Sequence, residues 1–146
     1  MFNCRVDGYN NLHLAILKQD LPRVKNLVEA EGKVNEPQTR QFRYTPLMLA
    51  IFTQNMEIIK YLLDHGADPN GQDAKGETPL IQLVLSADQS KADEIEELLI
   101  KHGADINKTN KLGISFILQK KQIVRAHEGT RYEGETNEAI KVIIIN

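Results

Sequence analysis

Two short strings recur along this chain at nearly the same interval. Thr-Pro-Leu at residues 45–47 returns at 78–80, which is 33 residues later. Gly-Ala-Asp at 66–68 returns at 103–105, which is 37 residues later, so four residues are inserted, and we place them within 86–91. A repeat period of about 20–50 residues indicates an array of small units, each stable only when stacked on its neighbours.

One copy of the repeat predicts its own local structure. Thr45 suits a helix N-cap, and Pro46 suits the first helical position, where a backbone N–H is not needed. A second helix follows, ends at Gly66 in a left-handed cap, and has apolar residues at helical spacing, namely Ile58, Ile59, Leu62 and Leu63. Asp73 to Gly76 then reads as a β-turn. Each copy is therefore helix, turn, helix and a hairpin-like loop.

Weaker copies flank the two clear ones. Residues 10–15 match 45–50, and Ser115-Phe116-Ile117-Leu118 replaces the Thr-Pro-Leu signature near the other end. The length of 146 residues suits one domain, 1–146. We expect four repeats, at approximately 8–35, 36–70, 71–107 and 108–146.

The spacing and the Thr-Pro-Leu and Gly-Ala-Asp strings resemble the ankyrin repeat family. The resemblance covers about residues 10–146, and the first and last repeats are degenerate. It implies an all-α solenoid of stacked helix-turn-helix units with projecting hairpin-like loops. It also implies a module that binds other proteins and is not an enzyme. The family histidine is present only at His13.

In that family, partners usually dock on the loop tips and the first helices, which form a concave face. The residues carried over to this chain are Arg40, Gln41, Phe42, Arg43, Phe52, Thr53, Gln72, Ala74, Lys75, Glu77, Leu85, Ser86, Thr109, Lys111 and Leu112. Most can equally be ordinary solvated turn residues, because few contacts dominate an interface. We favour a binding role for Arg40 and Phe42, whereas Tyr44 serves binding or local packing equally well.

Charge indicates the kind of partner. The net charge is only −2, which argues against a general nucleic-acid or membrane binder. No apolar run approaches the roughly 20 residues of a bilayer span. The loop tips are modestly basic, whereas the insertion and the helix after it are acidic, with Asp88, Asp93, Glu94, Glu96 and Glu97. We therefore expect a partner protein with an acidic or mixed-charge contact surface.

Metal, cofactor and catalytic sites are not expected. His65 and His102 occupy equivalent repeat positions, His13 occupies the family's structural position, and the only cysteine is Cys4. His127 lies in the polar segment 126–136, which reads as a loop without a pocket or an orienting partner. We predict no metal, no cofactor and no catalysis.

The last residues leave several interpretations open. Val142 to Ile145 is apolar all round, which predicts an exposed patch unless the natural chain continues, segment 126–136 covers it, or copies self-associate. The alternative function is a regulatory or targeting domain of a larger protein, possibly an enzyme. We expect a cytoplasmic protein, since one cysteine suits a reducing compartment. With 15 Ile, 12 Lys and 11 Asn against 6 Arg, the composition suggests an AT-rich genome and a host-directed effector.

Overall fold

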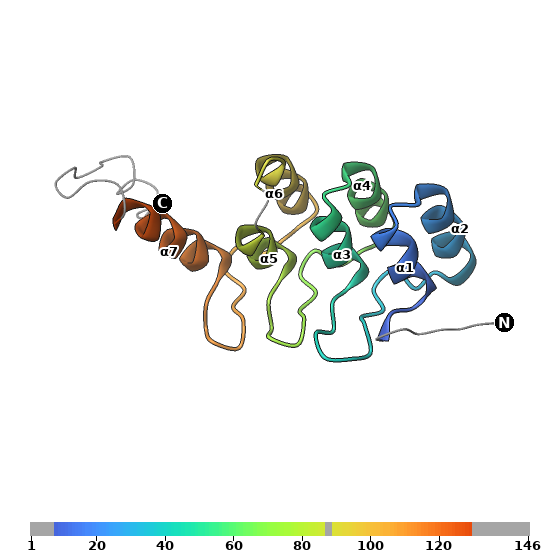
Figure 1. The fold of residues 1–146 in the computed structure, drawn as a ribbon, viewed down its shortest axis with the longest axis horizontal. Helices are drawn as coiled ribbons and strands as arrows, with labels where there is room; N and C mark the ends of the chain where they lie inside the picture. The colour runs from blue at the N-terminus through green and yellow to red at the C-terminus, as the bar shows by residue number, and fades with distance from the viewer. Residues whose placement is uncertain (1–7, 87–88, 130–146) are drawn as a thin grey trace.

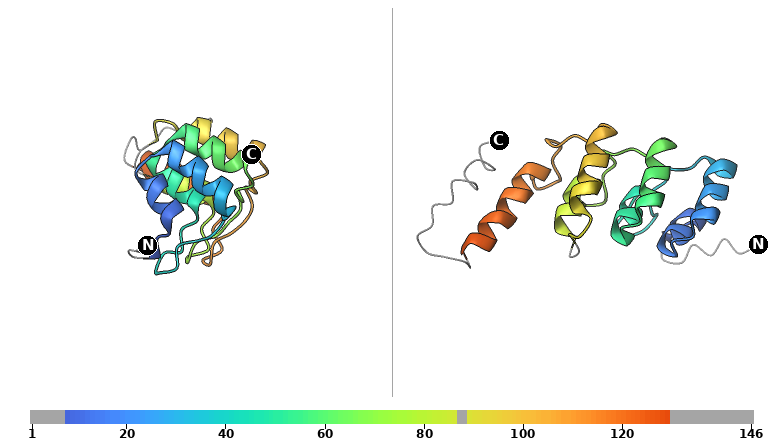
Figure 2. Two further views of the ribbon diagram at one scale, coloured as in Figure 1. Left: turned by 90° about the vertical axis from the view of Figure 1, so that its right-hand side faces the viewer. Right: turned by 90° about the horizontal axis from the view of Figure 1, so that it is seen from above.

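The computed structural model describes residues 8–86 and 89–129, which form α-helices in two layers (Figure 1). In chain order these are α1 (Asn11–Leu17), α2 (Leu21–Glu31), α3 (Pro46–Thr53), α4 (Met56–Asp64), α5 (Pro79–Leu85), α6 (Ala92–Lys101) and α7 (Phe116–Gly129). The odd-numbered helices form the first layer, and α2, α4 and α6 form the second layer. Successive helix pairs stack side by side (Figure 2). Three loops project together from one side of the stack. The predicted all-α solenoid is confirmed.

The repeated signature starts the helices as predicted. The hydroxyl of Thr45 accepts a hydrogen bond from the backbone N–H of Met48, and Thr78 does the same for Ile81, both at 3.3 Å. A proline fills the first turn of α3 and of α5. Ser115 takes over the capping role in front of α7, where its hydroxyl accepts from the N–H of Leu118 at 3.3 Å. The degenerate repeat therefore keeps the cap while losing the proline.

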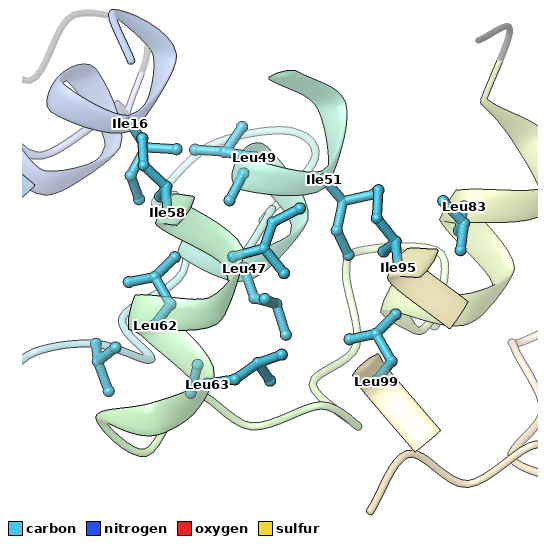
Figure 3. Close-up of a cluster of buried hydrophobic side chains, with 14 of the residues drawn as sticks. Ile16, Leu47, Leu49, Ile51, Ile58, Leu62, Leu63, Leu83, Ile95 and Leu99 are labelled. Carbon is cyan, nitrogen blue, oxygen red and sulfur yellow. The ribbon is translucent and has the colours of Figure 1, made fainter. Parts of the chain in front are cut away.

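Aliphatic side chains fill the space between repeats (Figure 3). Ile51 of α3 and Ile95 of α6 are both at most 1% exposed, although they belong to different repeats. Burying each such side chain contributes about 1.5–3 kcal/mol. The first-layer helix α3 is buried from Pro46 to Ile51, which leaves only its last turn for solvent. The core therefore runs along the stack and does not close around one centre.

The four inserted residues lie where they were predicted. Two residues join α3 to α4, whereas segment 86–91 joins α5 to α6. The end of this segment returns to the preceding repeat, because the Lys91 ammonium donates to the backbone oxygen of Gln54 at 3.3 Å. Lys91 also precedes α6 without a side-chain cap, unlike Asn55 in front of α4. The insertion thus exchanges a helix cap for a contact between repeats.

One expectation needs correction. Residues 126–129 were predicted to be loop, but α7 continues through Gly129, because no proline or earlier glycine interrupts its run of helix-forming residues. The remaining part, 130–136, lies outside the described residues, as do the apolar stretch 142–145 and its predicted self-association. Gln82 is a polar residue within the packing of α5. It is 5% exposed and donates to Asp73 Oδ2 at 3.2 Å.

Candidate functional site

Three hairpin-like tips form one edge of the molecule. We call residues 38–44 tip 2, residues 73–77 tip 3 and residues 110–114 tip 4. In each, the first residue donates its backbone N–H to the carbonyl oxygen of the last: Gln38 to Tyr44 at 2.8 Å, Asp73 to Glu77 at 3.1 Å and Asn110 to Ile114 at 3.0 Å. Tip 2 is longer than the other two, so it carries more side chains at its end.

Neighbouring tips are joined to one another by their backbones. Ala74 donates its N–H to the carbonyl oxygen of Phe42 at 2.9 Å, and Lys111 donates to that of Lys75 at 3.0 Å. Gly76 sits at the second junction with a φ of +76°, where an added Cβ would lie 2.9 Å from the Lys111 nitrogen. The tips therefore form one continuous ribbon across the repeats.

Side chains inside the tips add to this rigidity. The Oδ1 atom of Asp73 accepts from the N–H groups of Lys75 and Glu77, both at 2.9 Å. Asn110 makes the same two contacts within tip 4, at 2.9 and 3.0 Å. A surface fixed in this way loses little conformational freedom when a partner binds.

Arg43 departs from the repeat pattern at the end of tip 2. It lies two residues before the helix cap, which is the place of Gly76 in tip 3 and of Gly113 in tip 4. All three have positive φ, +54° for Arg43 and +76° for both glycines. A side chain in this region costs roughly 1–2 kcal/mol relative to right-handed backbone. Tip 2 thus holds a large exposed cation where the other tips have glycine.

An aromatic trio runs from tip 2 along α3. The rings of Phe42 and Tyr44 are stacked with centroids 5.3 Å apart, and Phe52 meets Tyr44 edge-on at 5.2 Å. Tyr44 is half-buried, whereas Phe42 is 41% and Phe52 47% exposed. Aromatic side chains are enriched in protein interfaces, and this trio offers two open rings supported by a packed one. The sequence marked Phe42 and Phe52, but it could not show that Tyr44 joins them.

Phe52 also belongs to an apolar row along the first-layer helices. Leu17, Phe52 and Leu85 each lie seven residues after their helix cap, in three successive repeats. All three are more than a third exposed. Gln122 takes the corresponding place in α7. The repeat therefore presents one large apolar side chain per unit on the same face, with the aromatic one in the middle.

The predicted contact residues are accessible to different degrees. Those exposed are Arg40, Gln41, Phe42, Arg43, Phe52, Gln72, Lys75, Leu85, Thr109, Lys111 and Leu112. Those half-buried are Thr53, Ala74, Glu77 and Ser86. Gln38, the first residue of tip 2, is buried at 3% exposure.

Some side chains at this edge hold the fold together. The Gln72 amide donates to the carbonyl oxygens of Gly76 and Thr109, at 2.8 and 3.0 Å, and so ties tip 3 to tip 4. Lys108 donates to the Asn70 carbonyl oxygen at 3.1 Å. The Gln72–Thr109 and Lys108–Asn70 contacts join neighbouring repeats, so the pattern of a single repeat does not predict them.

The exposed charges of tips 2 to 4 are mainly positive. Arg40, Arg43, Lys75 and Lys111 are exposed, whereas Asp73 is buried and engaged by backbone donors. Glu77 is half-buried, and its pKa is raised above the usual value by burial first and then by the nearby Asp73 charge. Burial likewise raises the pKa of Tyr44, with smaller contributions from the same two acids.

A groove of about 580 Å³ lies between α5, α6 and α7. Leu83, Ile123 and Val124 supply apolar side chains to it, and Glu96 and Lys120 form an ion pair at its edge, at 3.0 Å. No sequence pattern marks this groove, because it depends on how α7 packs against α5. In the part of the chain described, α6 has no following second-layer helix beside it.

Three histidines, His13, His65 and His102, form hydrogen bonds within the fold. His13 is fully buried; its Nδ1 accepts from the Asn10 N–H at 3.0 Å and its Nε2 donates to the Glu36 oxygen at 2.7 Å. His65 and His102 contact the carbonyl oxygens of Tyr61 and Leu98. No group of three or more histidines, cysteines or acids is placed to hold a metal ion among residues 8–86 and 89–129. Over the same residues, no helix is long and apolar enough to cross a membrane.

These paired helices, with tips that repeat at each unit, define a solenoid of the kind that presents an extended binding edge. A model of ankyrin repeats in three copies matches residues 4–110. The chain belongs to the ankyrin repeat family. The ankyrin repeat domain of Bcl-3 superposes with a TM-score of 0.68 over 77% of this chain and 47% of that one, at 23% identity, which shows the fold alone.

Several curated proteins are similar in sequence. ANK repeat-containing protein nipk-1 of Caenorhabditis elegans is 28% identical over 97% of this chain and 24% of its own length. Human Ankyrin repeat and SOCS box protein 6 is 34% identical over 77% of this chain and 27% of its own. Putative ankyrin repeat protein L86 of Acanthamoeba polyphaga mimivirus is 37% identical over 79% and 23%. This chain thus spans about a quarter of the length of these relatives.

Proposed function

We propose that this chain binds a partner protein through its loop tips and the exposed face of its first-layer helices. The observation that carries the proposal is the aromatic trio of Phe42, Tyr44 and Phe52, because two of its rings stay open to solvent on a rigid support. Large rings that are already fixed in place bind at low entropic cost, and such residues dominate interface energies. Ankyrin repeats generally serve protein–protein interaction, which agrees with this assignment.

The experiment is a selection of binders from a displayed library of protein fragments, followed by affinity measurements on two matched variants. Phe52→Ala removes an exposed ring of the trio, and Ile100→Ala removes a side chain of nearly equal exposure, 45% against 47%, from α6 in the other layer. We expect Phe52→Ala to weaken binding about tenfold or more. Ile100→Ala should leave it within about twofold.

Two results would contradict the proposal. One is a selection that yields no specific binder to the folded chain. The other is a set of binders whose affinity follows Ile100 and ignores Phe52, because that would place the contact surface on the second layer of helices.

A second candidate is a regulatory or targeting domain of a larger protein, such as an enzyme. It is favoured by the share of the relatives that this chain spans, about a quarter of each. An antibody against the chain tests it on the endogenous protein. A band at the 16.5 kDa of this chain would refute this candidate, whereas a much larger band would support it. The predicted cytoplasmic location and host-directed role rest on composition and stay predictions.

A further inference from the structure

Within the described residues, no hydrogen bond or ion pair of the Arg43 side chain offsets its backbone conformation. Its own N–H donates to the Arg40 oxygen at 3.0 Å, but its guanidinium forms no ion pair within the described residues. Gly76 and Gly113 fill the same place without the steric cost of a Cβ at positive φ. Strained backbone that the fold does not require is concentrated at functional sites. Among residues 8–86 and 89–129, the Arg43 guanidinium therefore has no charged partner and stays exposed.

Arg43 is one of four exposed cations on the ribbon of tips. In the described residues Arg40, Arg43, Lys75 and Lys111 all lack an ion-pair partner. Two acids lie within two residues of Lys75: Asp73 is buried and already accepts three hydrogen bonds, and Glu77 is half-buried. The edge is therefore positive although the whole chain carries −2. Unpaired charge of one sign at a contact surface selects a partner of the opposite sign.

The cations border the aromatic trio. Phe42 lies between Arg40 and Arg43 in the chain, and its ring stacks on Tyr44, which leads on to Phe52 in α3. Tip 2 therefore offers both guanidinium groups and exposed rings to a segment that crosses it. Guanidinium groups bind carboxylates with two parallel hydrogen bonds, and the rings accept an apolar side chain.

Resting on the proposed function, we propose that tip 2 binds an extended acidic segment of the partner protein. Carboxylates of that segment pair with Arg43 and Arg40, and an adjacent aromatic or long aliphatic side chain packs on Phe42 and Phe52. Arg43 acts as the residue that selects for acidity, because it replaces glycine at this tip alone among tips 2 to 4. A nucleic acid is disfavoured as the anion, since the chain is net negative and its cations are confined to one edge.

Labelled synthetic probes test this by fluorescence anisotropy. The probes are a short peptide of glutamates around one phenylalanine, the same peptide with glutamines for glutamates, the acidic peptide with serine for phenylalanine, and a single-stranded oligonucleotide of similar length. The acidic phenylalanine peptide should bind at least about tenfold more tightly than each of the others, and its affinity should fall at high salt.

The variants separate charge from folding. Arg43→Gly places a glycine at a positive φ, as Gly76 and Gly113 do in the other two tips. Glycine adopts this backbone conformation without strain, so the chain stays folded. We expect Arg43→Gly to weaken binding of the acidic phenylalanine peptide about tenfold, while the midpoint of thermal unfolding stays unchanged or rises. Lys60→Ala, which removes an exposed charge from α4, is the matched control and should change affinity less than about twofold.

Each other outcome overturns the inference. The inference is wrong if the glutamine peptide binds as tightly as the acidic one, or if Lys60→Ala loses as much affinity as Arg43→Gly. It is also wrong if the oligonucleotide binds more tightly than the acidic peptide, or if no peptide binds. Failure of this inference can be told apart from failure of the proposed function. If library-selected binders still depend on Phe52 while Arg43→Gly has no effect, the binding surface remains and only the acidic partner is wrong.

Discussion

The Asn70 side chain joins its own repeat to the next one at Gly103. Its amide nitrogen donates to the Gly103 carbonyl oxygen at 3.0 Å, while its Oδ1 accepts from the Asp105 N–H at 2.6 Å. Asn35 makes the same two contacts one repeat earlier, to Gly66 and Asp68. In both repeats, the asparagine therefore joins the turn that ends one second-layer helix to the turn that ends the next one.

Replacing Asn70 by alanine should therefore separate two repeats. We expect Asn70→Ala to lower the free energy of unfolding by about 1–3 kcal/mol, because two hydrogen bonds are lost. Asn107 is the matched control, since its side chain forms no hydrogen bond in the described residues; Asn107→Ala should change stability by less than about 0.5 kcal/mol. Urea unfolding followed by circular dichroism measures both. Equal losses in the two variants would show that the bonds between repeats contribute nothing.

Gly76 and Gly113 provide a comparison of contact between tips. Both have a φ of +76°, but an added Cβ meets the Lys111 nitrogen only at Gly76 and finds nothing within 4 Å at Gly113. Alanine at either position should cost roughly 1–2 kcal/mol for the backbone conformation. Gly76→Ala should cost about 1–3 kcal/mol more, because the tips must move apart. Thermal unfolding of the two variants checks the difference, and a smaller loss for Gly76→Ala would contradict the close approach.

Neighbouring residues of α3 should respond very differently to truncation. Ile51 is 1% exposed and packs between repeats, so Ile51→Ala should cost about 2–5 kcal/mol. Phe52 is 47% exposed, so Phe52→Ala should cost only about 0.5–1.5 kcal/mol, from its contact with Tyr44. Denaturant titration of both variants measures this. A Phe52→Ala loss as large as that of Ile51→Ala would make Phe52 a core residue.

The raised pKa of Glu77 predicts a pH dependence. Burial and the Asp73 charge disfavour its ionised form in the folded chain. Its contribution is therefore fully present below the ordinary pKa, 4.5, and is lost as pH rises through the raised folded-state pKa. Relative to Glu77→Gln, the wild type should be more stable in acid than at neutral pH. Urea unfolding of both proteins across this range provides the test, and a difference independent of pH would be the contrary result.

The local signals of the sequence predicted the elements well and the contacts between repeats poorly. Thr45, Pro46 and Gly66 act within one unit, so their roles follow from a single copy of the pattern. The bridging role of Gln72 and the ring stacking of Tyr44 depend on a neighbouring tip or helix, which no local pattern encodes. The repeat comparison identified the segment 86–91 because an insertion changes the period, whereas nothing in the period marked the end of α7.

Candidate contact residues were predictable as a surface but not in their individual roles. The tips are exposed in any repeat of this kind, so Arg40 and Lys111 lie where expected. The significance of Arg43 needed the φ angles, since the sequence shows only that an arginine replaces a glycine. The repeat boundaries and the residues beyond 129 stay predictions.

The main-chain hydrogen bonds between neighbouring tips affect how the molecule unfolds. Among the described helices, the main contacts lie within a repeat or between neighbouring repeats. Stacks of this kind unfold along one dimension, because each unit is stabilised by its neighbours. A segment that spans tips 2 and 3 would clamp the junction of Phe42 and Ala74. Occupancy at the edge would then slow hydrogen exchange in helices that the partner never reaches, because opening them first requires that junction to break.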